Sequence, residues 1–406
     1  MKYGFAEIDS FSGNRCSTTA MMARACPICD ELEDTTVVAF DRFQFYTDSA
    51  EQEKRATVRQ VVCRTCYALY MNPCYSSEGF AVLFAEAGKT YGATEMRKEE
   101  QLGWMRCHAL LEPGTVLMDV GCYTGDFIGT LPAEVIAVGV DIDAGVIAEA
   151  KKSNGTATFM TADFERFEYS GRVDVFTMFH VLEHLPNPKK VLVRLRALAH
   201  ENTRLVVEVP LLEKAKTNDI NGYLTISHLT HFSLNSLDRC LAESGWKVVA
   251  RTSQADYNGY RILAEPGASA PAGAGDPQDL SRLYDYLAHW YSQLAVASQR
   301  LAAIPSEDCV IWGAGFHSEL VYGLTGFFQA ADQRRFLMID GDPSKQGKSW
   351  RGVPIKPPEI LQELDWSRTV LLFSSYGSQE EMAKIALAKG VPADRAFRIY
   401  DFIRRY

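Results

Sequence analysis

The chain lacks several features that define whole classes of protein. None of its 406 residues belongs to a run approaching the roughly 20 uninterrupted apolar residues of a membrane-spanning helix. Its N-terminus also lacks the basic segment, apolar core and cleavage site of a secretory signal. We therefore expect a soluble, cytoplasmic protein with no membrane partner.

A dense block of Lys and Arg is missing as well. The net charge is −9, whereas neutralising nucleic-acid phosphates requires a basic surface, so we expect no nucleic-acid partner. Hydrophobic residues make up 47% of the chain, which is ample for globular cores. The length indicates two or three domains.

Cysteine, by contrast, is plentiful, and ten cysteines in a cytoplasmic chain are better explained by a metal than by disulfides. Four of them form two C-x2-C pairs, Cys26 with Cys29 and Cys63 with Cys66. Two such pairs can place four thiolates tetrahedrally around one Zn²⁺ and leave no open coordination position, so we predict a structural zinc site. The alternative is four unligated thiols.

The zinc-binding module should cover residues 25–80 and follow a tail at residues 1–24 that has no periodicity. The gap of 33 residues between the two cysteine pairs indicates an inserted β-hairpin around Val37–Val62. The other cysteines are interpreted as ordinary small apolar residues; they are Cys16, Cys74, Cys107, Cys122, Cys240 and Cys309.

The stretch Leu117–Phe127 has the pattern of a strand, a tight loop and a helix. Gly121 and Gly125 carry no Cβ, so the backbone can come close to a ligand, and the N-terminus of the following helix would present free N–H groups to an anion. Asp141 closes the next strand 20 residues past Gly121, about where nucleotide-binding βαβ units place a carboxylate on ribose hydroxyls. A third acid, Asp163, falls where a third strand should end.

These residues resemble the class I S-adenosylmethionine-dependent methyltransferases, an α/β Rossmann-like family, over roughly residues 85–265. The resemblance implies that Asp119 and the loop of Gly121 and Gly125 hold the methionine part of the cofactor, and that Asp141 holds the ribose. It also implies that Asp163 and Phe164 hold the adenine. Tyr123 stands where the family usually has its middle glycine. The alternative is a doubly wound domain without a ligand.

Two later segments should form the reaction centre. Phe179 to His184 follow the fourth strand, and ligands of such sheets lie beyond the carboxyl ends of the parallel strands, so this segment should line the site, with Phe179 beside the cofactor. The segment Leu224–Ser233 carries His228 and His231 before a helix at Leu234–Ser244. We interpret His228 and His184 as candidate catalytic residues, with structural roles as the alternative. For His231 packing or capping is favoured, and His180 and Glu183 are interpreted as residues at the start of a helix.

Residues 266–278 consist almost entirely of Pro, Gly, Ala and Ser, which indicates a linker. Residues 279–304 have the apolar spacing of a connecting helix. A second Rossmann-like α/β unit should occupy residues 305–406, with an edge strand near Ala396–Phe402. Gly313 and Gly315 resemble a dinucleotide loop, but Ser318 stands where the third glycine belongs.

The order of these three parts resembles the sugar C-methyltransferases that act on nucleotide-linked keto sugars. In that family the zinc and C-terminal domains are thought to frame the sugar nucleotide over the cofactor. The family has Glu-His where this chain has Ser227-His228, and a tyrosine where this chain has Thr225. Carbon becomes a nucleophile only after a positioned base removes a proton beside a ketone, whereas a hydroxyl needs only a modest base, so C- and O-methylation both stay open.

We therefore predict a methyltransferase, monomeric or homodimeric, that acts on a small-molecule sugar, nucleotide-activated or glycan-bound, in polysaccharide or natural-product synthesis. One alternative is a nicotinamide-dependent oxidoreductase that uses the C-terminal unit, although the chain lacks a Tyr-x-x-x-Lys pair. Another is a non-enzymatic adaptor built on the zinc ribbon. The acidic balance and the intact cofactor acids disfavour it.

Overall fold

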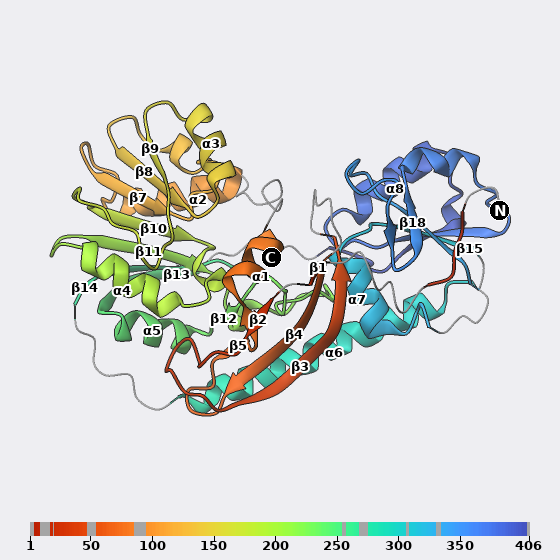
Figure 1. The fold of residues 1–406 in the computed structure, drawn as a ribbon, viewed down its shortest axis with the longest axis horizontal. Coiled ribbons are helices and arrows are strands. Elements are labelled where there is room, and N and C mark those ends of the chain that lie inside the picture. Colours follow the sequence, from red (N-terminus) through yellow and green to blue (C-terminus); the bar gives the residue numbers. More distant parts are fainter. Residues whose placement is uncertain are drawn as a thin grey trace.

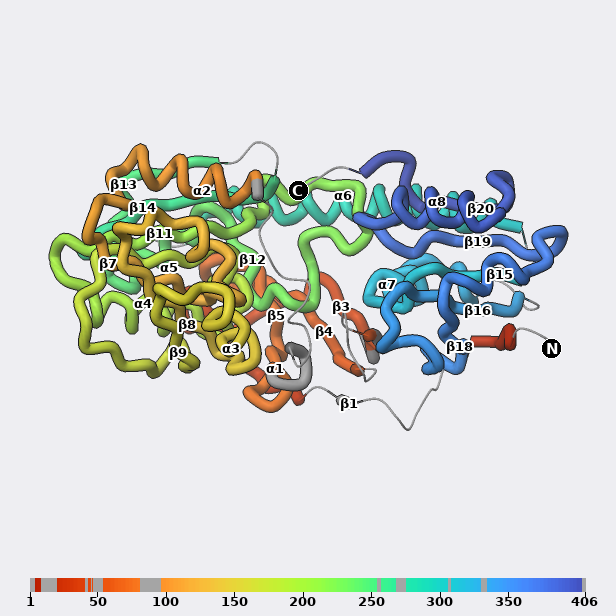
Figure 2. Tube along the Cα trace, turned by 90° about the horizontal axis from the view of Figure 1, so that it is seen from above, coloured from red at the N-terminus to blue at the C-terminus, as the bar shows by residue number. Residues whose placement is uncertain are grey.

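The computed structural model describes residues 4–8, 17–18, 20–46, 54–84, 95–253, 257–267, 275–305, 308–329 and 334–403. Two α/β lobes lie at opposite ends of the molecule, and the long helix α6 (Pro277–Ala302) runs from one to the other beside a β-hairpin (Figures 1 and 2). The α/β class predicted from the sequence is confirmed. Cys16 and much of the predicted linker lie outside the described residues.

The N-terminal part is organised around the hairpin that the cysteine spacing predicts. Its strands β3 (Asp34–Phe45) and β4 (Lys54–Cys63) pair antiparallel. On the other edge of β4 follow β5 (Leu69–Met71) and then β12 (Thr230–His231), so a strand from far along the chain completes this sheet. The remaining elements are β1 (Ser17–Thr18), β2 (Met21–Met22), β6 (Cys74–Tyr75) and α1 (Ser77–Phe84).

The central lobe is a seven-stranded sheet in the order β13-β14-β11-β10-β7-β8-β9. Only β14 runs against the other strands. The strands are β7 (Val116–Val120), β8 (Ile136–Asp141), β9 (Thr158–Thr161), β10 (Val175–Phe179), β11 (Arg204–Val209), β13 (Trp246–Ser253) and β14 (Tyr260–Pro266).

Helices cover both faces of this sheet. Leu102 and Met105 of α2 (Glu95–Cys107) pack with Leu117 on one face. On the other face α4 (Pro188–Leu198) and α5 (Leu234–Glu243) pack with Met118 and Phe176. Helix α3 (Ala144–Ser153) packs on Phe159. Short 3-10 turns are η1 (Ile128–Thr130), η2 (Leu182–His184) and η3 (Leu212–Lys214).

One predicted element of the central lobe is wrong. We expected an α-helix after the loop of Gly121 and Gly125, but only the turn η1 forms there. Gly129 and Pro132 leave too few consecutive helix-forming residues before β8 begins. A ligand at this loop would therefore meet the loop's own backbone rather than the N-terminus of a helix.

The C-terminal lobe is a six-stranded sheet in the order β17-β18-β16-β15-β19-β20, with the predicted edge strand at one end. Its elements are β15 (Asp308–Trp312), α7 (Phe316–Thr325), β16 (Phe336–Ile339), β17 (Ser349–Trp350), β18 (Val353–Lys356), η4 (Pro358–Glu363), β19 (Thr369–Phe373), α8 (Gln379–Ala388), η5 (Ala393–Arg395) and β20 (Ala396–Arg398).

Part of the predicted tail is fixed to this lobe. The backbones of Ala6 and Phe336 exchange two hydrogen bonds, 2.9 and 2.8 Å long, and Phe5 is buried in the core around Trp312 and Leu371. Burial of the apolar Phe5 side chain stabilises this contact, although the sequence around Phe5 has no periodicity. Residues 4–8 of the predicted tail are therefore attached to the C-terminal sheet.

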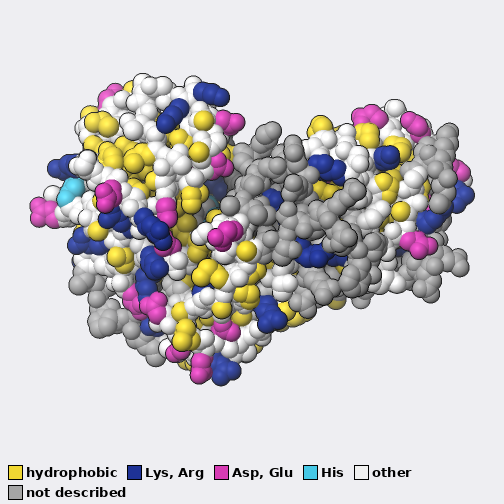
Figure 3. All heavy atoms as spheres, in the orientation of Figure 1, with side chains coloured by type: hydrophobic (Ala, Val, Ile, Leu, Met, Phe, Trp, Pro, Cys, Tyr) yellow, Lys and Arg dark blue, Asp and Glu magenta, His cyan; other side chains and the backbone are white. Residues whose placement is uncertain are grey.

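Two hydrophobic cores connect the parts of the chain. One core joins the β3–β4 hairpin to α6, to the segment after β11 and to the C-terminal sheet. A second joins the cysteine region to one face of the central sheet. None of the helices in the described ranges has both the length and the hydropathy to cross a bilayer. On the face shown in Figure 3, basic and acidic side chains are interspersed.

Candidate functional site

The predicted cofactor acids lie on neighbouring strands. Strands β10, β7, β8 and β9 are adjacent and parallel, so Asp119, Asp141 and Asp163 come from the same edge of the sheet. Asp141 accepts hydrogen bonds from the backbone N–H groups of Tyr123 and Asp143, both 3.0 Å long. Burial raises the pKa of Asp141, and these hydrogen bonds oppose the rise. Asp141 therefore fixes the glycine loop against the end of β8.

Asp119 lies deeper than its neighbours, with 4% of its surface exposed. It stands opposite Thr177 of β10, whose hydroxyl donates to its carboxylate over 2.7 Å. Burial raises the pKa of Asp119 to about 7, because the charged form loses its hydration. The carboxylate thus lies between two strands, and its contact with the methionine part of a cofactor stays a prediction.

Gly121 and Gly125 both have left-handed backbone, with φ of +80° and +78°. A Cβ on Gly121 would lie 2.4 Å from the Cγ2 atom of Val181, and one on Gly125 would lie 2.7 Å from the side-chain nitrogen of Asn154. Tyr123, at the family's middle-glycine position, also has a positive φ of 51°. Glycine at 121 therefore allows the segment after β10 to press against the loop.

The remaining predicted cofactor residues line the same region. The Asp163 side chain is 51% exposed and its carboxylate accepts from the backbone of Glu165 over 2.9 Å. Phe164 is buried, and the Phe179 ring packs edge-on against Phe127 with 4.8 Å between centroids. These positions suit apolar walls beside a strand-end acid. Their contacts with a bound cofactor stay predictions.

The two histidine segments meet. His184 and His228 have ring centroids 4.8 Å apart, and the Nδ1 atom of His184 lies 2.8 Å from the carbonyl oxygen of Ser227. The backbone N–H of Leu229 donates to the carbonyl of Glu183 over 2.8 Å. Burial and the nearby His184, His231 and His180 hold the pKa of His228 well below its ordinary value. The structure thus brings together both residues that the sequence marks as candidates.

His231 has a different environment. It is buried on β12, and its Nε2 atom lies 2.9 Å from the side-chain oxygen of Gln60 on β4. Burial, followed by the charge of Arg24, lowers its pKa to about 3. Its contact therefore links the histidine segment to the N-terminal sheet.

Sequence reasoning missed a buried polar network next to this centre. His180, with φ of 55°, places its Nδ1 atom 3.3 Å from Glu183 and its Nε2 atom 3.2 Å from Glu208. Glu208 is buried on β11 and accepts from Arg261 of β14 over 2.7 Å. Burial opposes the charge of Glu208, but His180 and Arg261 outweigh it and lower the pKa of that carboxyl to about 2.

The signal for this network was present in the sequence. Glu208 interrupts an apolar strand, and a charged residue in a buried strand is rare unless it is paired. Gln101 and Tyr257 also donate to Glu208, over 2.9 and 3.1 Å. His180 and Glu183 therefore belong to a polar cluster and do not merely start a helix.

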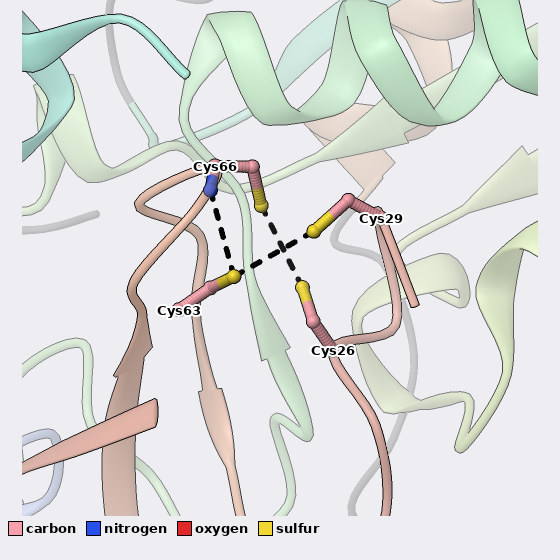
Figure 4. A group of neighbouring side chains, drawn as sticks. All are labelled: Cys26, Cys29, Cys63 and Cys66. Carbon is pink, nitrogen blue, oxygen red and sulfur yellow. Dashed lines mark hydrogen bonds between the residues drawn. The ribbon is translucent and has the colours of Figure 1, made fainter. Parts of the chain in front are cut away.

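The four predicted metal cysteines converge (Figure 4). The Sγ atoms of Cys26 and Cys66 are 3.6 Å apart, as are those of Cys29 and Cys63. A zinc tetrahedron with bonds of about 2.3 Å has sulfur–sulfur edges of about 3.8 Å, so the cluster fits Zn²⁺. The N–H groups of Thr65 and Cys66 point to the sulfur of Cys63, over 3.4 and 3.5 Å, as donors that would stabilise a thiolate.

The C-terminal lobe has its own glycine loop. Asp340, after β16, accepts from the N–H groups of Ala314 and Asp342 over 2.8 and 2.9 Å. Lys345 is buried with its ammonium 3.5 Å from Asp340. Ser318, at the third-glycine position, donates to the Gly313 carbonyl, and its hydroxyl lies 2.8 Å from the Ser374 hydroxyl.

Residues 95–251 match the family described as methyltransferase domain. The central lobe is thus a methyltransferase domain, and it carries the strand-end acids and the glycine loop that we predict to hold the cofactor. The protein is an S-adenosylmethionine-dependent methyltransferase.

Several solved structures are similar to the chain. One is an S-adenosylmethionine-dependent methyltransferase from Clostridium acetobutylicum, with 10% identity and a TM-score of 0.38, covering 47% of this chain and 98% of that one. Another is magnesium protoporphyrin IX methyltransferase from Synechocystis with bound SAM, with 20% identity and a TM-score of 0.35, covering 47% of this chain and 92% of that one. No curated protein matches the chain.

Proposed function

We propose that this enzyme methylates a sugar, carried on a nucleotide, at carbon or oxygen. The observation that carries the proposal is that the segment bearing His228 is held by all three parts of the chain. This arrangement suits an acceptor that is framed by the zinc module and the C-terminal lobe while its reacting atom lies over the central domain.

The C-terminal lobe holds the first part of this segment. Tyr376 donates to the Asn218 side chain over 2.6 Å, and the Tyr400 hydroxyl lies 3.3 Å from the Asp219 carboxylate. The backbone N–H of Ile220 donates to the same Tyr400 hydroxyl over 3.2 Å. A change in the C-terminal lobe would therefore reach the chain eight residues before His228.

Helix α6 and the zinc module hold the rest. The Tyr286 hydroxyl accepts from the backbone of Tyr223 over 2.8 Å, and Trp290 donates to the Ile220 carbonyl over 2.9 Å. Beyond His228, β12 pairs with β5, and the Tyr75 hydroxyl donates to the Ile226 carbonyl over 3.1 Å. The loop between these anchors is thus fixed on both sides of His228, which suits a residue that must meet a reacting atom at a set distance.

When bound, S-adenosylmethionine supplies the methyl group as a sulfonium. The chain's own task is to orient the acceptor and to hold or remove its proton. Ser227 replaces the acidic neighbour of His228, but Glu183 brings a buried carboxylate from the other segment, with a ligand atom within 4.8 Å of those of His184 and His228. A buried carboxylate close to His228, brought by the other histidine segment, supports the proposal of deprotonation at carbon as well as at oxygen.

The test is a calorimetric titration with S-adenosylmethionine followed by a screen of nucleotide-linked sugars and keto sugars for a gain in mass of one methyl group. The wild type should also exchange the proton beside the sugar ketone with deuterated water when S-adenosylhomocysteine replaces the donor. Methylation on oxygen without exchange would overturn C-methylation alone. Cofactor binding with no methylated sugar in the screen would overturn the sugar proposal.

The His228→Ala variant should lower the rate by about 10²–10⁴ and leave cofactor affinity nearly unchanged. The matched control is His108→Ala, because His108 lies on the helix α2 side of the domain and contacts Trp104. Equal rates for His228→Ala and the control would contradict a role for His228 in activating the acceptor.

A further inference from the structure

We propose that Glu183, His184 and His228 form a second metal site, separate from the cysteine cluster, that binds one divalent transition-metal ion. Each residue offers one ligand atom, and these atoms all lie within 4.8 Å of one another. Ligands bound tetrahedrally to one ion at about 2.1 Å lie about 3.4 Å apart, so no pair of these atoms needs to close by more than about 1.4 Å.

The first argument is the state of Glu183. Its side chain is 1% exposed, and among the described residues no hydrogen bond reaches either carboxylate oxygen. Its nearest charged contacts are His180 at 3.3 Å, which is shared with Glu208 at 3.2 Å, and His184 at 3.9 Å. A buried carboxylate with no hydrogen bond is costly, and a bound cation satisfies it.

The second argument is the tautomer of His184. A carbonyl oxygen can only accept, so the contact of 2.8 Å between the Nδ1 atom of His184 and the Ser227 carbonyl places the proton on Nδ1. The Nε2 atom then carries the lone pair, on the side of Glu183. A ligating histidine is oriented in this way, with its second nitrogen bound to a carbonyl or carboxylate.

The third argument is His228. Its Nδ1 atom is buried and has no hydrogen-bond partner in the described part of the chain. The ring stands edge-on to His184, with a tilt of 70°, so the two imidazoles converge without stacking. Two residues of this cluster therefore carry buried polar atoms that a cation would satisfy.

The ligand set indicates the class of ion. Two imidazoles with one carboxylate suit Mn²⁺, Fe²⁺, Co²⁺ or Zn²⁺, and three protein ligands leave open positions. The cysteine cluster, with four sulfurs, leaves none. The site also adjoins the cofactor loop, because Val181 beside it packs on Gly121. An acceptor oxygen can thus complete the coordination next to the methyl donor.

The role of the ion rests on the proposed function, whereas its binding does not. An ion at this place would polarise the keto oxygen of a sugar and stabilise the enolate, or lower the pKa of a hydroxyl. His228 would then hold the ion, and a hydroxide in an open position of the ion would be the base that takes the proton and becomes water. Ion binding and methylation can be measured separately, so each can fail alone.

The experiment uses the full chain with its cysteine cluster loaded with zinc. Mn²⁺ is added and the free ion is counted by electron paramagnetic resonance, because Mn²⁺ prefers nitrogen and oxygen ligands and does not displace zinc from thiolates. Co²⁺, followed by its visible absorption, is the second ion. We expect one equivalent to bind without thiolate charge-transfer bands.

The variants Glu183→Gln, His184→Gln and His228→Gln should each weaken this binding at least tenfold, whereas His108→Gln should bind as the wild type does. Zinc content and circular dichroism identify variants that fail to fold. Absence of binding by both ions to the wild type overturns the site, as does binding by folded His228→Gln and Glu183→Gln that is as tight as binding by the wild type. Full methylation after selective removal of this ion overturns its catalytic role and leaves the proposed function standing.

Discussion

The central and C-terminal lobes share one local structure, a glycine loop and a strand-end acid, but different residues surround it in each lobe. In each, a glycine loop follows the first strand and an acid ends the second. Asp141 accepts from Tyr123 and Asp143, and Asp340 accepts from Ala314 and Asp342, all within 3.0 Å. The pattern of strand, glycine loop and acid therefore determines the backbone geometry in both places.

The residues around the glycine loop and the acid differ between the two lobes. Beyond the C-terminal loop the full helix α7 begins at Phe316, and the ammonium of Lys345 neighbours Asp340. Beyond the central loop only η1 forms, and the histidine segment packs on Gly121 through Val181. The loop and the acid thus determine the same backbone shape in both lobes, while the neighbouring side chains give each lobe different chemical groups beside it.

The largest expected effect follows from loss of the metal at the cysteine cluster, which should destabilise the central lobe much more than the C-terminal lobe. Cys26, Cys63 and Cys66 belong to the same core as the central sheet, so Cys63→Ser should destabilise that lobe by about 4 kcal/mol or more. Hydrogen exchange should rise in β7 and β8 and much less in β15. The exposed Cys107→Ser is the control.

Elemental analysis should find one zinc per chain, and less than about half an equivalent would count against the site.

The second effect tests whether both loops need their first glycine. Gly121→Ala would place a Cβ 2.4 Å from Val181, and Gly313→Ala would place one 2.6 Å from the backbone oxygen of Ser374. Both have positive φ, so each variant should lose about 2–4 kcal/mol of unfolding free energy. Gly315→Ala meets nothing within 4 Å and should cost far less. Equal stability of all three variants in urea would break the comparison.

The third effect distinguishes a direct loss of cofactor binding from a general change in the geometry of a glycine loop. Asp141→Ala should weaken S-adenosylmethionine binding by about 1.5–3 kcal/mol, the range for hydrogen bonds to a charged group. Asp340→Ala removes the same type of backbone contact from the other lobe and should leave that affinity unchanged. Calorimetric titration measures both. Unchanged affinity in Asp141→Ala would remove the ribose assignment.

The smallest effect concerns Asp119, which has Ile311 as its counterpart two residues before the C-terminal loop. Burial raises the pKa of Asp119 to about 7 from 3.8, so the folded state retains a proton that the unfolded state has lost. Stability should therefore fall as pH rises from about 4 to about 7 and then level off. Asp119→Asn should flatten this slope and stabilise the cofactor-free protein at pH 8 by about 1–2 kcal/mol. An unchanged slope in urea titrations at several pH values would contradict this prediction.

The sequence was most informative where chemistry is local. The C-x2-C spacing and the acids at strand ends predict their own geometry, because each pattern spans a few residues. The helix predicted after Gly125 does not form, and the reason is equally local. Gly129 and Pro132 disfavour a helix there, although the apolar residues have helical spacing.

Contacts between distant segments could not be predicted in this way. Glu208 meets Arg261 only because β11 and β14 pair in that register, and β12 joins β5 across more than half of the central domain's length. The carboxylate beside His228 comes from Glu183 rather than from position 227 for the same reason. Such pairings depend on tertiary packing, which no short window of sequence contains.

The shared sheet has a consequence for how such enzymes can be recombined. Because β12 supplies the edge of the N-terminal sheet, a crossover placed between the zinc module and the methyltransferase domain would leave β5 without its partner strand. The cysteine module and the methyltransferase domain are thus not interchangeable units. A chimaera that keeps this sheet intact has to exchange the cysteine module together with the segment that carries His228.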